Sequence, residues 1–214
     1  MAPVLHGTPV STCTQRVLTV LKELNLDLEI DSIGRDWAKT KTPEWIAKQP
    51  FGQVPYLEDG SFILTESRAI TKYVVAKYGN GSSLLPPASD LEATARFDAA
   101  ASIEQANFDK FASDIAFEKV FKLFFGQKTD EARVTELVGK LEQKLDGYER
   151  ILSKSKYLAG DVLTIVDLAH LPYGWKVAND AGIDIFNATK RPNLARWWSE
   201  ISSRESWKSV IASA

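Results

Sequence analysis

The stretch QPFGQVPYLEDG, residues 49–60, places Pro55 inside an apolar run and ends in Asp59-Gly60. An Asp-Gly pair between two short apolar runs predicts a β-hairpin. Because proline lacks the N–H that a central strand donates, Pro55 marks an edge strand or a special turn. Two interpretations stay open. The pattern alone favours a trans proline that begins a strand, whereas a cis proline would leave the backbone of Val54 free to pair with an extended peptide-like ligand.

The residues on either side of this stretch change their hydrophobic period several times. They predict the order strand, helix, strand, helix, hairpin, helix. The expected elements are a strand over 3–6, a helix over 11–25, a half-buried strand over 26–33, a helix from Thr42-Pro43, the hairpin, and a helix from Glu66 to Gly79 or Gly81.

The second half of the chain shows helical periodicity and no strand signal. Helical patterns run over about 90–125, 129–154, 164–179 and 193–203. Gly, Ser and Pro gather just before them, which is typical of a linker. We therefore predict an α/β domain over 1–80, a linker over 81–89 and an all-α domain over 90–214.

Composition excludes several classes of protein. The chain has 214 residues, a formal net charge of −2 and 44% hydrophobic residues, so a nucleic-acid partner held by phosphate contacts and a disordered chain are both disfavoured. A single cysteine fits a reducing compartment. No signal peptide or membrane span is apparent, and we expect a cytoplasmic protein.

Two helix starts carry polar side chains that suit a ligand. Ser11, Thr12 and Cys13 precede the apolar positions of the first helix, and a helix N-terminus presents free N–H groups and a partial positive charge. Glu66 and Ser67 stand at a second strand-to-helix boundary. Ser67 is either a plain helix cap or part of a seat for a carboxylate, with Glu66 beside it to receive an ammonium group.

These motifs together resemble those of a cytosolic glutathione transferase of the phi class, found in plants and fungi. The resemblance covers essentially the whole chain and is strongest in STCTQRVL (11–18), TPEWIAKQPFGQVPYLEDG (42–60) with ESRAI (66–70), and YLAGDVLTIVDLAH (157–170). It implies a thioredoxin-like first domain of βαβαββα order, an all-α second domain, a homodimer and a cis Pro55.

The resemblance also assigns roles at matching positions. Ser11 matches the family's catalytic serine, and glutathione is the implied co-substrate. The implied glutathione-binding residues are Lys41 near the glycine carboxylate, Gln53, Val54 and Pro55 at the cysteinyl part, and Glu66 and Ser67 at the γ-glutamyl end. Many family members carry His where this chain has Thr40, so one contact at the glycine end is in question.

The first helix offers two rival groups, Ser11 and Cys13. Lowering a thiol pKa by about two units takes roughly 2.7 kcal/mol. A hydroxyl hydrogen bond to the thiolate, worth about 1.5–3 kcal/mol, together with the helix dipole, is sufficient. Cys13 lies two residues further along the helix and is rotated by about 200° from Ser11, so we expect it to pack as an inert side chain. Thr12 and Cys13 remain backup candidates.

The predicted activity is conjugation of the glutathione thiolate to apolar electrophiles, with reduction of organic hydroperoxides as a side activity. The alternatives are thiol–disulfide exchange through Cys13 and a non-catalytic ligand-binding module. The candidates for the apolar substrate site are Trp37, Phe108, Phe111, Ile115 and Phe117. The pattern fits a place in the hydrophobic core equally well for each of them.

Other features receive structural interpretations. Thr164 and Asp167 have capping-box spacing, and the charges from Lys128 to Lys156 are interpreted as a solvated helix face. Phe51 and Arg68 are candidates for the dimer seam. The pattern of His6 and His170 predicts no metal site.

Overall fold

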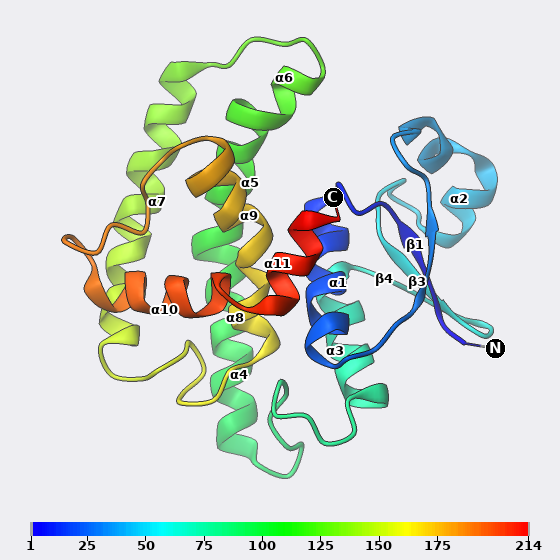
Figure 1. The fold of residues 1–214 in the computed structure, drawn as a ribbon, viewed down its shortest axis with the longest axis horizontal. Helices are drawn as coiled ribbons and strands as arrows, with labels where there is room; N and C mark the ends of the chain where they lie inside the picture. The colour runs from blue at the N-terminus through cyan, green and yellow to red at the C-terminus, as the bar shows by residue number, and fades with distance from the viewer. Residues whose placement is uncertain (1, 214) are drawn as a thin grey trace. The chain divides into compact units, whose positions relative to one another are not determined.

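The chain forms two compact units in the computed structural model, which describes residues 2–213 (Figure 1). The first unit runs up to Leu85 and also contains the chain from Arg204 onward, while the second spans Pro86–Ser203. The sequence pattern predicts an all-α domain that extends to residue 214. The structure instead places the residues after Ser203 in the first unit, where helix α11 (Glu205–Ala212) packs against α1 (Thr12–Glu23).

A four-stranded sheet in the order β2-β1-β3-β4 forms the centre of the first unit. β1 pairs parallel with β2 and antiparallel with β3, and β3 pairs antiparallel with β4. The strands are β1 (Val4–Gly7), β2 (Glu29–Ser32), β3 (Tyr56–Asp59) and β4 (Phe62–Thr65). The element order confirms the thioredoxin-like arrangement expected from the resemblance.

Strand β2 differs from its prediction. All four of its residues are exposed, and Ile30 keeps 37% of its surface accessible. The reason is position: β2 is an edge strand with β1 as its only neighbour. The alternation of apolar and acidic residues in 26–33 therefore located a strand correctly but overstated its burial.

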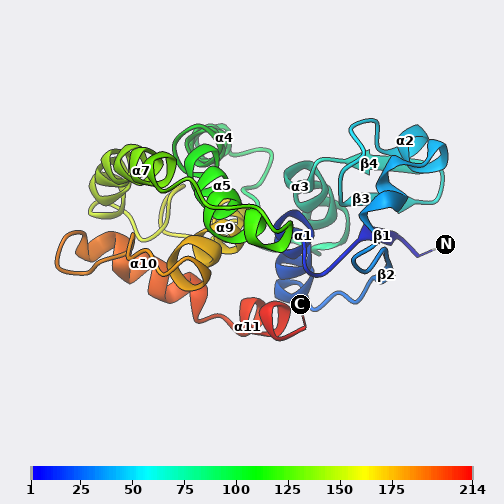
Figure 2. The same ribbon diagram turned by 90° about the horizontal axis from the view of Figure 1, so that it is seen from above.

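The helices of the first unit cover both faces of the sheet. α1 and α3 (Ser67–Tyr78) lie together on one face and α2 (Pro43–Lys48) lies on the other (Figure 1, Figure 2). A short 3₁₀ helix, η1 (Trp37–Lys41), precedes α2. Of the apolar positions that the helical spacing gave for α1, Val17, Leu18, Val20 and Leu21 are buried and Leu24 is half-buried at its C-cap. The polar residues from Thr14 to Arg16 are buried as well.

The β3–β4 hairpin is tied to α3 through Asp59. Gly60 has φ +65°, which glycine adopts without steric cost in a tight turn. The Asp59 carboxylate accepts hydrogen bonds from Lys77 Nζ at 2.5 Å, Tyr78 OH at 2.5 Å and Tyr73 OH at 2.7 Å. The bond from Lys77, followed by those from the two tyrosines, lowers the Asp59 pKa from 3.8 to about 2.

The second unit is helical. Its first helical run extends from Leu91 to Phe124 and contains two wider π turns. The elements are α4 (Leu91–Glu104), η2 (Gln105–Asp109), α5 (Lys110–Ala116), η3 (Phe117–Phe121), α6 (Lys122–Phe124), α7 (Glu131–Leu152), α8 (Ile165–Ala169), α9 (Leu171–Trp175), η4 (Lys176–Asp180) and α10 (Pro192–Ser202). Within residues 2–213, no helix combines the length and apolar character that a membrane crossing requires.

The capping box predicted at Thr164 and Asp167 forms at the start of α8. Asp167 is fully buried. Its Oδ2 accepts the Thr164 N–H at 2.9 Å, and its Oδ1 accepts the Leu158 N–H at 3.1 Å and Trp197 Nε1–H at 2.9 Å. One carboxylate therefore joins the start of α8 to the preceding loop and to α10.

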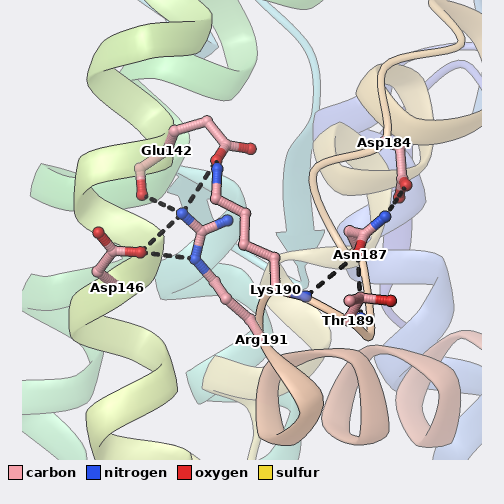
Figure 3. A network of polar contacts seen from close by, with 7 residues as sticks. All are labelled: Glu142, Asp146, Asp184, Asn187, Thr189, Lys190 and Arg191. Atoms are coloured by element: carbon pink, nitrogen blue, oxygen red, sulfur yellow. Dashed lines mark hydrogen bonds and ion pairs between the residues drawn. The ribbon is translucent and has the colours of Figure 1, made fainter.

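The charged face of α7 is more than the solvated surface that the sequence suggested. Arg191, 2% exposed, donates from Nε to Asp146 Oδ1 at 2.8 Å and from Nη2 to the backbone oxygen and carboxylate of Glu142 (Figure 3). Lys190 also pairs with Glu142. Further along α7, Glu149 Oε2 accepts the N–H of Leu194 in the first turn of α10 at 2.9 Å. Helical periodicity cannot distinguish a face that binds water from one that binds another segment of the chain.

Candidate functional site

Ser11 is the N-cap of α1, with φ −81° and ψ 127°. Its N–H donates to the Thr8 carbonyl at 3.0 Å, and Gln15 Nε2 donates to the Pro9 carbonyl at 2.9 Å. These two bonds fix the turn that leads into the helix. The Ser11 oxygen accepts the Thr14 N–H at 3.5 Å, the outer limit for such a bond. The Ser11 side chain is half-buried at the N-terminus of α1.

Thr12 and Cys13 are placed differently from Ser11. Thr12 is buried, with 5% of its surface exposed. Cys13 is a free, half-buried thiol, and its Sγ lies 3.7 Å from Nη1 of Arg16. The cysteine side chain therefore lies beside Arg16, one helical turn further along α1.

The loop before β3 is shaped by two buried side chains. Gln49 Oε1 accepts the N–H groups of Phe51 at 2.8 Å and Gln53 at 3.3 Å. Trp45 Nε1 donates to the Gln53 carbonyl at 3.0 Å. The Gln53 side chain is exposed, so its amide is available to a ligand while its backbone is held.

The Val54-Pro55 peptide bond is cis, as the resemblance implied. Gly7, at the end of β1, approaches this bond and α1 closely. A Cβ at Gly7 would lie 2.8 Å from Thr14 Oγ1 and 3.2 Å from Pro55 Cβ. Real Cβ atoms essentially never come within 3.0 Å of another heavy atom, and 3.2 Å is a tight contact. Glycine therefore allows the Pro55 loop and the first turn of α1 to approach β1 without a shift.

Lys41 lies beside this loop and Thr40 points elsewhere. Lys41 Nζ donates to the Gly52 carbonyl at 2.8 Å, one residue before Gln53. Gly52 has φ +59°, and a Cβ there would lie 2.8 Å from Lys41 Nζ. Thr40 is 2% exposed and its hydroxyl donates to the Trp37 carbonyl at 2.9 Å. The Thr40 hydroxyl is therefore used within η1.

Glu66 and Ser67 form the boundary between β4 and α3. Glu66 has φ +69° and ψ 109°, a left-handed region that glutamate rarely adopts. Ser67 is the first residue of α3 and is 5% exposed. Its Oγ accepts a hydrogen bond from Arg16 Nη1 at 2.8 Å. This bond joins α1, which carries Ser11, to α3.

The candidates for the apolar substrate site differ in how much of their surface is exposed. Trp37 and Phe117 are 42% and 45% exposed. Phe111 and Ile115 are buried. Phe108 is 1% exposed and packs in the second unit against His170, with ring centroids 4.7 Å apart, and against Tyr148, at 6.3 Å. Burial favours a core role for Phe108, Phe111 and Ile115. Trp37 and Phe117 remain as the accessible aromatics among the candidates.

Three residues of this site were not identified in the sequence: Arg16, Gln49 and Trp45. Arg16 directly precedes the apolar positions of α1, and the sequence does not show that it is buried. Gln49 and Trp45 act by hydrogen bonds to backbone groups of a loop. Neither periodicity nor turn signals reveal such bonds.

Two family models match the chain. The glutathione S-transferase N-terminal domain matches residues 5–76, and the glutathione S-transferase C-terminal domain matches residues 112–205. Together they cover most of both units, and the first includes Ser11, Lys41, Gln53, Glu66 and Ser67.

Individual relatives agree with these matches. Glutathione S-transferase PM239X14 of Arabidopsis thaliana is 46% identical over 197 residues, which cover 91% of this chain and 88% of that protein. The crystal structure of glutathione transferase F7 from Populus trichocarpa superposes with a TM-score of 0.90 at 36% identity, covering 99% and 98% of the two chains. Maize glutathione S-transferase I, in complex with an atrazine glutathione conjugate, gives a TM-score of 0.88 at 33% identity, covering 99% and 97%. The chain belongs to the phi class of the glutathione transferase family.

Proposed function

We propose that this transferase joins the thiolate of glutathione to apolar electrophiles, and that Ser11 keeps the glutathione sulfur ionised by donating a hydrogen bond to it. One observation carries the proposal. Ser11 caps α1, and within residues 2–213 its hydroxyl accepts one long bond from Thr14 and donates to no protein acceptor. The hydroxyl proton is therefore available to a bound sulfur.

The energy required is small enough for this one group and the helix end. A thiol with a pKa near ~8.5 is only a few per cent ionised at neutral pH. Lowering that pKa by about two units takes roughly 2.7 kcal/mol. A hydrogen bond to a charged sulfur supplies about 1.5–3 kcal/mol, and the positive end of α1 adds about 0.3–1 kcal/mol.

The remaining polar groups seat the tripeptide. In this proposal the cis Pro55 turn presents the Val54 backbone to the cysteinyl residue, and the exposed Gln53 amide binds beside it. Glu66 receives the γ-glutamyl ammonium group and Ser67 receives the carboxylate of the same residue. Lys41, at 2.8 Å from the Gly52 carbonyl, supplies positive charge for the glycine end.

The second substrate is an apolar electrophile of broad identity. Trp37 and Phe117 are the exposed aromatic candidates, and in this proposal each offers apolar surface to such a compound. The maize relative is in complex with an atrazine glutathione conjugate, which is the kind of product that this reaction gives. The same thiolate can reduce organic hydroperoxides, giving an alcohol, water and glutathione disulfide from two glutathione molecules, and we propose this as a secondary activity.

Two further properties complete the proposal. We place the enzyme in the cytoplasm, because its single cysteine suits a reducing compartment. We also propose a homodimer with Phe51, 71% exposed, at its seam. Arg68, in the first turn of α3, is the second residue assigned to that seam.

A pair of variants tests the role of Ser11. Ser11→Ala should lower kcat/KM for aryl-halide conjugation about 10- to 100-fold, the loss of a bond of about 1.5–3 kcal/mol. The pKa of enzyme-bound glutathione, followed by thiolate absorbance, should rise toward its free value. Affinity for S-methylglutathione, which has no ionisable thiol, should stay within about twofold.

Cys13→Ser is the matched control, since it lies on the same helical turn. It should leave conjugation and the bound-thiol pKa close to those of the parent. If Cys13→Ser abolishes conjugation and glutathionyl-disulfide reduction while Ser11→Ala spares them, the enzyme is a cysteine-dependent thiol exchanger and the proposal is wrong.

A further inference from the structure

We propose that Arg16 is a positioning residue that holds the Ser67 hydroxyl as a hydrogen-bond donor toward the α-carboxylate of the γ-glutamyl residue. The inference rests on the glutathione seat proposed above and assigns it one further residue. Arg16 lies on α1, five positions after Ser11, whereas Ser67 begins α3.

The direction of the Arg16–Ser67 hydrogen bond follows from chemistry. Arg16 Nη1 lies 2.8 Å from Ser67 Oγ. A guanidinium group only donates hydrogen bonds, so the serine oxygen must accept. Both side chains are nearly inaccessible, with 1% and 5% of their surfaces exposed, and water does not compete freely for the bond.

The Ser67 proton is left for a ligand. Within the described part of the chain the Ser67 hydroxyl donates to no protein acceptor. A hydroxyl whose oxygen is engaged by a cation is a stronger donor, because hydrogen bonds in a chain polarise one another. The group that completes this arrangement is an anionic acceptor, and a carboxylate at the N-terminus of α3 meets the requirement.

Arginine is therefore not interchangeable with other polar residues at this position. A glutamine side chain would bring a carbonyl oxygen that can accept the Ser67 proton and so compete with the ligand. A methionine of similar length would fill the space but leave the hydroxyl free to rotate. Only a donor-only side chain fixes the direction of the Ser67 hydroxyl.

If Arg16 positions Ser67, loss of Arg16 should weaken glutathione binding and leave the rate of the chemical step unchanged. The α-carboxylate keeps its position while the sulfur reacts, so its contacts stabilise ground state and transition state alike. Loss of Arg16 should raise KM for glutathione with little change in kcat at saturation. The pKa of the bound thiol, which depends on Ser11, should stay as in the parent enzyme.

A double-mutant cycle on the full-length protein tests the coupling. Calorimetric Kd values for glutathione are measured for Arg16→Met, Ser67→Ala and the double variant. Arg16→Met should weaken binding about tenfold or more, as expected for loss of a charge-assisted bond. In the Ser67→Ala background the same substitution should change Kd by less than about threefold.

A second ligand separates positioning from general damage. γ-Aminobutyryl-cysteinylglycine is glutathione without its α-carboxylate, and Arg16→Met should leave its Kd within about twofold of the parent value. Arg16 makes other interactions, so a fall in melting temperature is expected and decides nothing. Arg16→Lys, which keeps a donor-only cation, should recover part of the glutathione affinity.

Arg191→Met is the matched control, because Arg191 is an equally buried arginine of the second unit. It should lower stability and leave both Kd values unchanged. The inference is overturned if Arg16→Met weakens the binding of both peptides equally. It is also overturned if Arg16→Met weakens glutathione binding just as much in the Ser67→Ala background. Failure of the parent enzyme to bind glutathione would instead refute the proposed function.

Discussion

Arg204 and Glu23, 181 positions apart in the sequence, form a two-bond ion pair. Arg204 Nε and Nη2 lie 2.6 Å from Oε1 and Oε2 of Glu23, and the Ser206 hydroxyl donates to the same carboxylate. Burial opposes ionisation of Glu23, but the bonds from Arg204 and Ser206 outweigh it and lower the Glu23 pKa. The C-terminal end of α1 is thus fastened to the last helix of the chain.

Breaking this pair should release α11 from the first unit. We expect Glu23→Gln to reduce the free energy of unfolding by about 2 kcal/mol, since it removes a charge-assisted pair in which Arg204 is partly exposed. Hydrogen exchange of residues 204–213 should accelerate more than that of any strand. Urea unfolding and exchange mass spectrometry measure the two effects.

Lys208→Met provides the control on the same helix. Lys208 pairs with Glu205 at 2.8 Å, but both side chains are more than half exposed, and such pairs contribute little. This variant should change stability by less than about 0.5 kcal/mol. Equal exchange rates over α11 in Glu23→Gln and in the parent would show that the pair does not hold the helix.

Stability should also fall in acid because of Asp59. A carboxylate whose pKa is depressed in the folded state stabilises the fold above its unfolded pKa of about 3.9, and this contribution is lost as the pH falls through the folded value. The pKa of Asp59 is lowered to about 2, so the loss falls between about pH 4 and pH 2.

Asp59→Asn should isolate this contribution. At pH 6 the variant should be less stable by about 1–2 kcal/mol, and the difference should shrink toward zero near pH 2. Asp27→Asn is the control, because Asp27 pairs with Lys22 at 3.0 Å while 91% exposed. If the difference in the free energy of unfolding between Asp59→Asn and the parent stays constant from pH 6 to pH 2, the contribution does not come from ionisation of Asp59.

Sequence patterns located the elements of this protein well where one face is apolar. Local spacing predicted the apolar positions of α1, of which all but Leu24 are buried, and the hairpin at Asp59-Gly60. Both follow from interactions within a few residues. The end of the chain was assigned to the wrong unit for the opposite reason. α11 is held by its packing against α1 and by the pair with Glu23, and no local pattern reports partners so far away in sequence.

The site was predictable only in part from its own residues. Helix-start signals drew attention to Ser11 and to Ser67, and the resemblance supplied their roles. The hydrogen bond between Arg16 and Ser67 depends on how α1 packs against α3, so it could not be read from spacing. The same holds for Gln49, whose amide oxygen organises a loop by accepting two backbone N–H groups.

The ion pairs of Arg191 should contribute strongly to stability, although the helix face that supplies their carboxylates was interpreted from the sequence as solvated. Arg191→Met removes bonds to Glu142 and Asp146, and we expect a loss of about 2–4 kcal/mol in the free energy of unfolding. Lys190→Ala removes a pair whose lysine is 56% exposed and should cost less than about 1 kcal/mol. Urea titration compares the two, and equal losses would mean that burial of the arginine does not matter.

The exposure of Phe51 predicts a change of oligomeric state on substitution. With 71% of its surface accessible on the loop before β3, Phe51 is a large apolar side chain that an isolated subunit leaves in water. Burying one phenylalanine supplies about 1.5–3 kcal/mol, and a two-fold dimer buries it twice. Phe51→Ser should therefore raise the dimer dissociation constant by about 10²- to 10⁴-fold.

Sedimentation velocity over a range of concentrations measures this constant. Phe124→Ser is the matched control, because Phe124 is 72% exposed and belongs to the second unit. It should leave the dimer intact, since exposure alone does not make a contact. A parent enzyme that sediments as a monomer, or a Phe51→Ser variant that dimerises as tightly as the parent, would remove Phe51 from the seam.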